Sequence, residues 1–214
     1  MSQSATFEPV KNAPEPPRRE RILDAAQACF VRSGFHRATM QEVAQEADMS
    51  PGNLYRTFPS KEAIVVGLCE RDQAALVREF MQLPENIELI PAVYQMLRRQ
   101  FTDKPPEFYF LILEIWSQST RNPELARVRE CSEDTVRAHI LKFLQKGQAM
   151  GKINPETDLV MAVKVLFTLV SGLFRSRAHE ADFDVDDELA MTMGVFAKVL
   201  DGTVKPMKFS IEDR

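Results

Sequence analysis

Two short helical segments joined by only three residues constrain this chain more than any other feature of its sequence. Thr39-Met40-Gln41-Glu42 has the form of a capping box, which predicts that the first segment begins there. Ser50-Pro51 places a cap residue and a first-turn proline at the start of the second segment, and Pro59 ends it. Because so short a connection prevents antiparallel packing, the two helices must cross at a steep angle, as in a helix-turn-helix.

Helical periodicity also predicts the rest of the chain. Ile22, Ala25, Ala26, Cys29 and Phe30 fall on one face of a helix that begins near Arg18 and ends at Gly34, expected at a left-handed cap position. Further helices are expected over Ser60–Leu83, Ile87–Phe101, Pro106–Ser119, Pro123–Met150, Pro155–Arg177 and Val185–Leu200, where Asn122-Pro123 and Asn154-Pro155 are start signals. The predicted fold is therefore all-α, with about nine helices.

Composition places the protein among soluble cytoplasmic proteins. The net charge is −4, but residues 1–61 carry +1 and the remainder −5, so any charge that faces nucleic acid is local. Three widely spaced cysteines predict neither a disulfide framework nor a zinc site, and no metal or cofactor is expected. No secretory signal opens the chain, and the longest apolar stretch, Leu159–Phe174, contains Lys164 and is shorter than the roughly 20 residues that span a bilayer.

The second short helix, about Pro51–Phe58, is the candidate to enter a DNA major groove, which accepts one helix. With Leu54 directed inward, the outward residues are Gly52, Asn53, Tyr55 and Arg56. Gly52 would let the backbone approach DNA closely, Asn53 can pair with adenine, and Arg56 with guanine or phosphate. Tyr55 offers a hydroxyl to a phosphate and a ring to a thymine methyl group.

Residues at the edges of the two short helices complete the candidate DNA site. Thr39 and Lys61 lie at helix amino termini, which favour phosphate. Arg18, Arg19 and Arg21 fit two alternatives equally well: a flexible arm that reaches phosphates or a minor groove, or a solvated first turn.

The run from Arg18 to Cys69 resembles the tetracycline-repressor (TetR) family of bacterial regulators. The likeness is strongest from Phe35 to Ala44 and from Met49 to Glu62, the second reading Met-Ser-Pro-Gly-Asn-Leu-Tyr-Arg-Thr-Phe-Pro-Ser-Lys-Glu. The resemblance implies DNA contacts by a set of residues that lies on and beside the two short helices: Thr39, Gln41, Ser50, Pro51, Gly52, Asn53, Tyr55, Arg56, Thr57 and Lys61. Thr57 departs from the histidine that many members use to contact phosphate, although its hydroxyl could do so more weakly.

The larger half of the chain is expected to bind a small-molecule effector. Phe108–Trp116 is apolar nearly all round, which predicts a helix buried on most sides, and an apolar region with a few polar groups is typical of ligand sites. The candidate ligand residues are Tyr94, Phe101, Tyr109, Glu114, Trp116 and Phe167. Glu114 needs a partner when buried: a cationic ligand is one alternative, and an internal ion pair with Arg98, Arg99 or Lys164 is the favoured one.

The last two predicted helices offer more apolar surface than one domain can cover. Resemblance to the family implies a four-helix homodimer interface there, with Val163, Phe167, Val170, Phe174, Met193 and Phe196 as its candidate residues. The expected domains are 18–64 for DNA binding and 65–203 for ligand binding and dimerisation, flanked by a disordered segment over 1–17 and a loose tail over 204–214.

No catalytic motif is visible, since His36, His139 and His179 are scattered and no nucleophile elbow or phosphate-binding glycine loop occurs. The sequence predicts a non-enzymatic, ligand-responsive repressor that binds a palindromic double-stranded DNA operator as a homodimer. The alternative is an architectural DNA-binding protein that ignores ligands or is controlled by a protein partner.

Overall fold

The computed structural model describes residues 17–82 and 88–204, and this part of the chain consists of nine α-helices with no strand. The predicted all-α fold is confirmed. The helices are α1 (Arg18–Ser33), α2 (Met40–Glu46), α3 (Pro51–Thr57), α4 (Lys61–Met81), α5 (Leu89–Thr102), α6 (Pro106–Ser119), α7 (Pro123–Ala149), α8 (Leu159–His179) and α9 (Val185–Leu200). Residues 1–16 of the predicted disordered segment 1–17 and residues 205–214 of the predicted tail 204–214 lie outside the described residues, as do the expected helix ends at Leu83 and Ile87.

Local capping explains where the first helices begin and end. The Thr39 side chain accepts the Glu42 N–H while the Glu42 carboxylate accepts the Thr39 N–H, so the expected capping box is present at α2. Ser50 caps α3 by accepting the Asn53 N–H, and Ser60 caps α4 by accepting the Ala63 N–H. Gly34 follows α1 with φ +80°, a value that only glycine adopts without strain.

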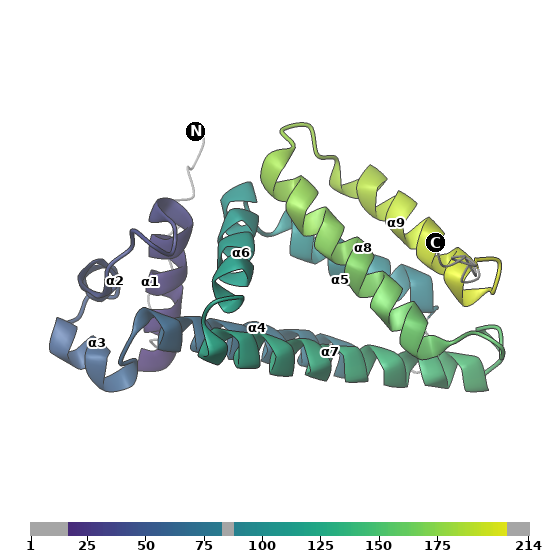
Figure 1. The fold of residues 1–214 in the computed structure, drawn as a ribbon, viewed down its shortest axis with the longest axis horizontal. Helices are drawn as coiled ribbons and strands as arrows, with labels where there is room; N and C mark the ends of the chain where they lie inside the picture. The colour runs from purple at the N-terminus through teal and green to yellow at the C-terminus, as the bar shows by residue number, and fades with distance from the viewer. Residues whose placement is uncertain (1–16, 83–87, 205–214) are drawn as a thin grey trace, which may run out of the picture.

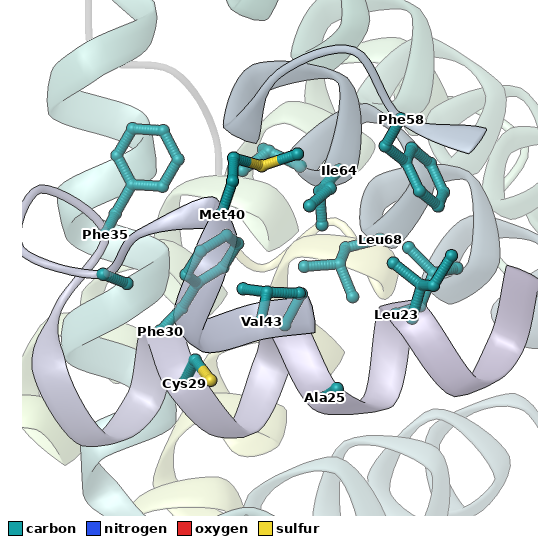
Figure 2. Packing of buried hydrophobic residues seen from close by; sticks show 14 of the residues in the cluster. Leu23, Ala25, Cys29, Phe30, Phe35, Met40, Val43, Phe58, Ile64 and Leu68 are labelled. Atoms are coloured by element: carbon teal, nitrogen blue, oxygen red, sulfur yellow. The ribbon is translucent and has the colours of Figure 1, made fainter. Parts of the chain in front are cut away.

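The first three helices and the start of α4 enclose one apolar core (Figure 2). Phe30 from α1, Val43 from α2, and Ile64 from α4 are almost completely buried and meet at its centre. Leu54 from α3 joins them, as its spacing predicts. Packing in this core therefore stabilises the short helices, because helices of this length are not stable on their own.

The remaining helices form a second, larger body (Figure 1). Helices α4 and α7 lie side by side along one edge, and α8 and α9 pack on one another, with α5 against α9. Helix α6 stands between α1 on one side and α8 on the other. The head is α1 to α3 with the first turns of α4, and its apolar core also includes Leu111 and Ile115 of α6 and Leu125 of α7.

The start of α8 differs from the prediction. The helix begins at Leu159, capped by Asp158, whereas Asn154-Pro155 forms a separate turn. The N–H of Asn154 donates to the carbonyl of Leu200 at 3.2 Å, and the Thr157 hydroxyl donates to the same carbonyl at 3.0 Å. This turn is thus used to satisfy the last carbonyls of α9, which explains why a good start signal does not start a helix here.

Helix α8 is the one described helix that is long and apolar enough to cross a membrane. In the structure it packs against α6, α7 and α9, and residues such as Leu166 and Leu173 are buried in the larger body. Its apolar composition therefore has a structural use within this fold.

Candidate nucleic-acid interface

Helix α3, the candidate to enter a DNA groove, is held on the head by its inner face. Leu54 is completely buried and Phe58, the residue after α3, is nearly so. Arg18 of α1 donates from Nη2 to the carbonyl of Asn53 at 2.8 Å, and Arg21 donates to the carbonyl of Ala47 at 3.0 Å. These bonds hold α3, and the turn between α2 and α3, against α1.

The arginines of α1 form contacts within the protein that neither alternative considered for them includes. Arg18 and Arg21 bind backbone carbonyls of the helix-turn-helix, and Arg19 pairs with Glu70 at 2.6 Å while its guanidinium lies 5.7 Å from the centre of the Phe58 ring. Periodicity could not reveal this, because the partners are brought close only by the fold.

The outer face of α3 presents the predicted groove-facing residues together. Pro51, Gly52, Tyr55 and Arg56 are exposed, with Tyr55 at 50%. A methyl group built at Gly52 would meet no atom of the protein within 4 Å. The fold therefore does not require glycine there, whereas close contact with another molecule would.

Half-buried polar residues lie at the edge of this face. Asn53 and Thr57 are partly exposed, and the Thr57 hydroxyl lies 3.5 Å from the Asn53 carbonyl. Ser50 and Gln41 are exposed on the neighbouring turn and on α2. Amide and hydroxyl groups are thus accessible on α2, on the turn and on α3.

Thr39 and its partner Glu42 are exposed, but their polar groups are used within the capping box. The Thr39 hydroxyl donates to the Glu42 carboxylate at 3.0 Å, and this bond together with the bond from the Thr39 N–H lowers the pKa of that carboxyl. A phosphate beside Thr39 would have to share the hydroxyl with Glu42.

Lys61 is the first residue of α4, as expected, and its side chain binds to the neighbouring loop. Its Nζ donates to the carbonyls of Phe35, at 2.7 Å, and His36, at 3.1 Å, and lies 4.8 Å from the centre of the Phe35 ring. The ammonium group is therefore engaged in the loop between α1 and α2.

The candidate ligand residues do not converge on one cavity in the described structure. Phe101 and Tyr109 are stacked at 5.2 Å and completely buried, and Trp116 reaches the same aromatic cluster through Phe174 at 5.7 Å. Phe167 lies elsewhere, beneath the guanidinium of Arg137 at 4.7 Å.

Tyr94 is also separate from the aromatic cluster's centre. Its hydroxyl donates to Asp186 at 2.8 Å, which ties α5 to the first turn of α9. Together with the guanidinium of Arg98, this bond holds the pKa of Asp186 down at about 2.

Glu114 does not form the predicted ion pair with Arg98, Arg99 or Lys164. Its carboxylate accepts hydrogen bonds from the backbone N–H groups of Phe35, at 2.8 Å, and His36, at 3.2 Å. The Nε2 of the His36 ring also lies 3.8 Å from this carboxylate, so the partners of Glu114 are Phe35 and His36. The reason is positional: this residue of α6 faces the head rather than the aromatic cluster.

The candidate dimer residues divide into two groups. Val163, Met193 and Phe196 are enclosed by their own protomer, with at most 4% exposure, so the prediction that they contact a second copy is corrected. Phe167, Val170 and Phe174 are half-buried. The exposed apolar surface of the last two helices consists instead of Val160 and Met161 on α8 and Ala190, Met191 and Val195 on α9.

Two residues with distinct roles in the structure carried no sequence signal. Gly67 on α4 is so tightly packed that an added methyl group would lie 2.9 Å from Phe58 and 3.0 Å from Leu23. Arg177 on α8 has a buried Nε without a hydrogen-bond partner among the described residues, and its guanidinium lies 5.7 Å from the Phe183 ring.

Comparison with known proteins covers both bodies. Residues 22–68 match the family model of bacterial regulatory proteins, tetR family, and residues 92–200 match the C-terminal domain of the BetI-type transcriptional repressor. The HTH-type transcriptional regulator UidR of Escherichia coli strain K12 is 27% identical over 190 residues, which are 86% of this chain and 91% of that protein.

Solved structures of other proteins share this fold. GusR of Salmonella enterica superposes with a TM-score of 0.73 at 29% identity, covering 89% of this chain and 98% of that one. The transcriptional regulator FadR of Bacillus subtilis, in complex with stearoyl-CoA, shares the fold with a TM-score of 0.71 at 18% identity, covering 86% and 98%.

Proposed function

The chain belongs to the tetR family of bacterial regulatory proteins, and we propose that it is a cytoplasmic, ligand-responsive repressor that binds a palindromic DNA operator as a homodimer. The observation that carries the proposal is the outer face of α3. Gly52, Tyr55 and Arg56 are exposed on this face, while the buried Leu54 on the opposite side packs the helix into the core.

Base reading is assigned to the polar residues of the head that face outward. Asn53 can form paired hydrogen bonds with adenine, Arg56 with guanine, and Gln41 reaches a base from α2. Gly52 lets the backbone of α3 lie close to the groove, since nothing in the protein fills the space at its Cα.

Phosphate contacts are assigned to the residues around the two short helices. Tyr55 and Thr57 offer hydroxyl groups, and Thr39, Ser50 and Pro51 mark helix amino termini, whose N–H groups attract anions. Since the Lys61 ammonium is bound to the loop after α1, we assign its phosphate contact to the first turn of α4 rather than to Nζ.

Dimerisation is assigned to the outer stripe of α8 and α9. On α9 the exposed residues Ala190, Met191, Gly194 and Val195 recur at helical spacing, and their small or apolar side chains suit close helix packing. A dimer of this kind must hold two recognition helices about 34–36 Å apart, or a related spacing, to engage successive major grooves.

Effector binding is assigned to residues 65–203, and DNA binding to residues 18–64. In the larger body, the aromatic cluster of Phe101, Tyr109 and Trp116 provides the apolar surroundings that small molecules prefer. FadR of Bacillus subtilis, which has this fold, was solved in complex with stearoyl-CoA, and this supports a sensing role here.

The test begins with selection of bound sequences from a random DNA pool by the full-length chain. We expect a palindrome, bound by a dimer, with an affinity that falls steeply as salt rises. Effectors are then screened by the fluorescence of Trp116, the only tryptophan. A true effector must lower the affinity for the operator, and the operator must lower the affinity for the effector by the same factor. A tight ligand without effect on DNA binding would favour a ligand-blind architectural protein instead.

A further inference from the structure

The backbone of the loop between α1 and α2 is hydrogen-bonded by charged side chains of two different helices, an arrangement called the clamp below. Glu114 of α6 accepts the N–H groups of Phe35 and His36, at 2.8 and 3.2 Å. Lys61 of α4 donates to the carbonyls of the same two residues, at 2.7 and 3.1 Å. All four backbone polar groups of Phe35 and His36 are therefore used in this clamp.

The carboxylate forms the part of the clamp that comes from the larger body. The side chain of Glu114 is 26% exposed, and hydrogen bonds to an ionised acceptor in such partly buried positions are stronger than bonds between neutral groups. Gln118, one turn further along α6, adds a contact of 2.6 Å between its Nε2 and the Nε2 of His36.

An apolar contact lies beside the clamp. Leu111 and Ile115 of α6 belong to the same buried cluster as Phe30 and Ile22 of α1. Such a contact is not directional, so it does not by itself fix one hydrogen-bonded register of α6 against the head. The hydrogen bonds of Glu114 are directional and thus fix one register.

The opposite side of α6 meets the aromatic cluster, where Tyr109 and Trp116 pack against Phe174 of α8. One rigid helix therefore joins the head to the interior of the larger body. A displacement of α6 by less than one residue would break both bonds of Glu114, because hydrogen bonds weaken steeply beyond about 3.2 Å.

We propose that Glu114 is a positioning residue for operator binding: its carboxylate locks the α1–α2 loop and so sets the angle at which each head is presented to DNA. The proposal rests on the proposed function, since it assumes that two heads engage two half-sites. Without the lock, each head keeps its own base contacts but the distance between the two recognition helices becomes variable.

The variants are chosen to separate positioning from folding. Glu114→Ala removes both acceptors, and Glu114→Gln keeps one acceptor oxygen with nearly the same volume. The matched control is Glu107→Gln, which makes the same change of charge on an exposed residue in the first turn of α6. All are made in the full-length chain and compared by thermal unfolding first.

The measurement is the affinity for the selected palindrome and for versions with one or two base pairs inserted between its half-sites. We expect the wild type and Glu107→Gln to reject the inserted sites. Glu114→Ala should bind the palindrome about tenfold more weakly, as when only a tenth of the molecules hold the competent arrangement, and should discriminate far less between spacings. Amide exchange at Phe35 and His36 should accelerate in the same variant.

The outcomes are distinguishable. A Glu114→Ala protein that folds, shows faster exchange at Phe35 and His36 and still rejects inserted sites as the wild type does would overturn the positioning role. If Glu114→Ala fails to fold, Glu114→Gln decides by the same comparison of spacings. A wild-type chain that selects no sequence from the random pool would instead refute the proposed function.

Discussion

Replacing Gly52 with alanine should change stability and DNA binding in opposite directions. Gly52 is the second residue of α3, and a methyl group at its Cα would meet no protein atom within 4 Å. Its backbone has no positive φ that would require glycine. The only intramolecular effect of the substitution is therefore the helix propensity, which favours alanine by up to about 1 kcal/mol.

The magnitude of the two effects follows from these facts. For a chain of this size, a gain of up to 1 kcal/mol raises the midpoint of thermal unfolding by about 2–4 °C at most. Against DNA, the same methyl group would stand between α3 and the groove and push Asn53 and Arg56 away from the bases. The loss of one paired base contact costs about 1–3 kcal/mol, and it occurs in both half-sites.

Gly67→Ala is the matched control, because the same chemical change is made in a crowded place. Its new methyl group would lie 2.9 Å from Phe58 and 3.0 Å from Leu23, so overpacking should destabilise the head by about 1–3 kcal/mol. Thermal unfolding and fluorescence anisotropy with labelled operator measure both quantities for both variants. If Gly52→Ala bound the operator as tightly as the wild type, the outer face of α3 would not lie against DNA.

Three further predictions address the other surfaces. Asn53→Ala should cost about 1–3 kcal/mol on the selected operator and little on random DNA, as measured by anisotropy; equal losses on both would mean that α3 docks differently. Met191→Glu, on a side chain that is 72% exposed, should yield a folded monomer in sedimentation, whereas Phe196→Glu should unfold the protomer because Phe196 is completely buried. The pKa of Asp186 is lowered to about 2, so its carboxylate stabilises the fold above about pH 4, and this contribution disappears as the pH falls toward 2. Asp186→Asn should thus flatten the fall in melting temperature over that range, and an unchanged acid profile would contradict the role of Arg98 and Tyr94.

The sequence predicted most of the helices because their start signals are local. Thr39 with Glu42, and Ser50 with Pro51, define α2 and α3 from neighbouring residues alone, and the structure places both caps as expected. Asn154-Pro155 has an equally good local signal, yet it forms a turn that satisfies the carbonyl of Leu200, 46 residues later in the chain. Local patterns fail where a distant element competes for the same polar groups.

The same limit explains the surface of α8 and α9. Spacing shows that Met193 and Phe196 share an apolar stripe with Leu189 and Leu200, but it does not show whether that stripe meets its own protomer or another. In the structure this stripe faces the core, and the outer stripe is the less apolar one that contains Met191 and Val195. The more hydrophobic face of a helix is the better candidate for the core of its own chain, and an interface is made from what remains.

Glu114 shows how an exception in an apolar helix should be interpreted. A carboxylate within Phe108–Trp116 must have partners, and the sequence suggested the cationic side chains of Arg98, Arg99 and Lys164 or a cationic ligand. Backbone N–H groups are equally good partners, but they are present in every residue and therefore leave no mark in a sequence. The loop after Gly34 exposes two of them because the positive φ of this glycine turns the chain away from α1 before α2 begins. The glycine that ends the first helix and Glu114 of α6 are thus two parts of one contact between the head and the larger body.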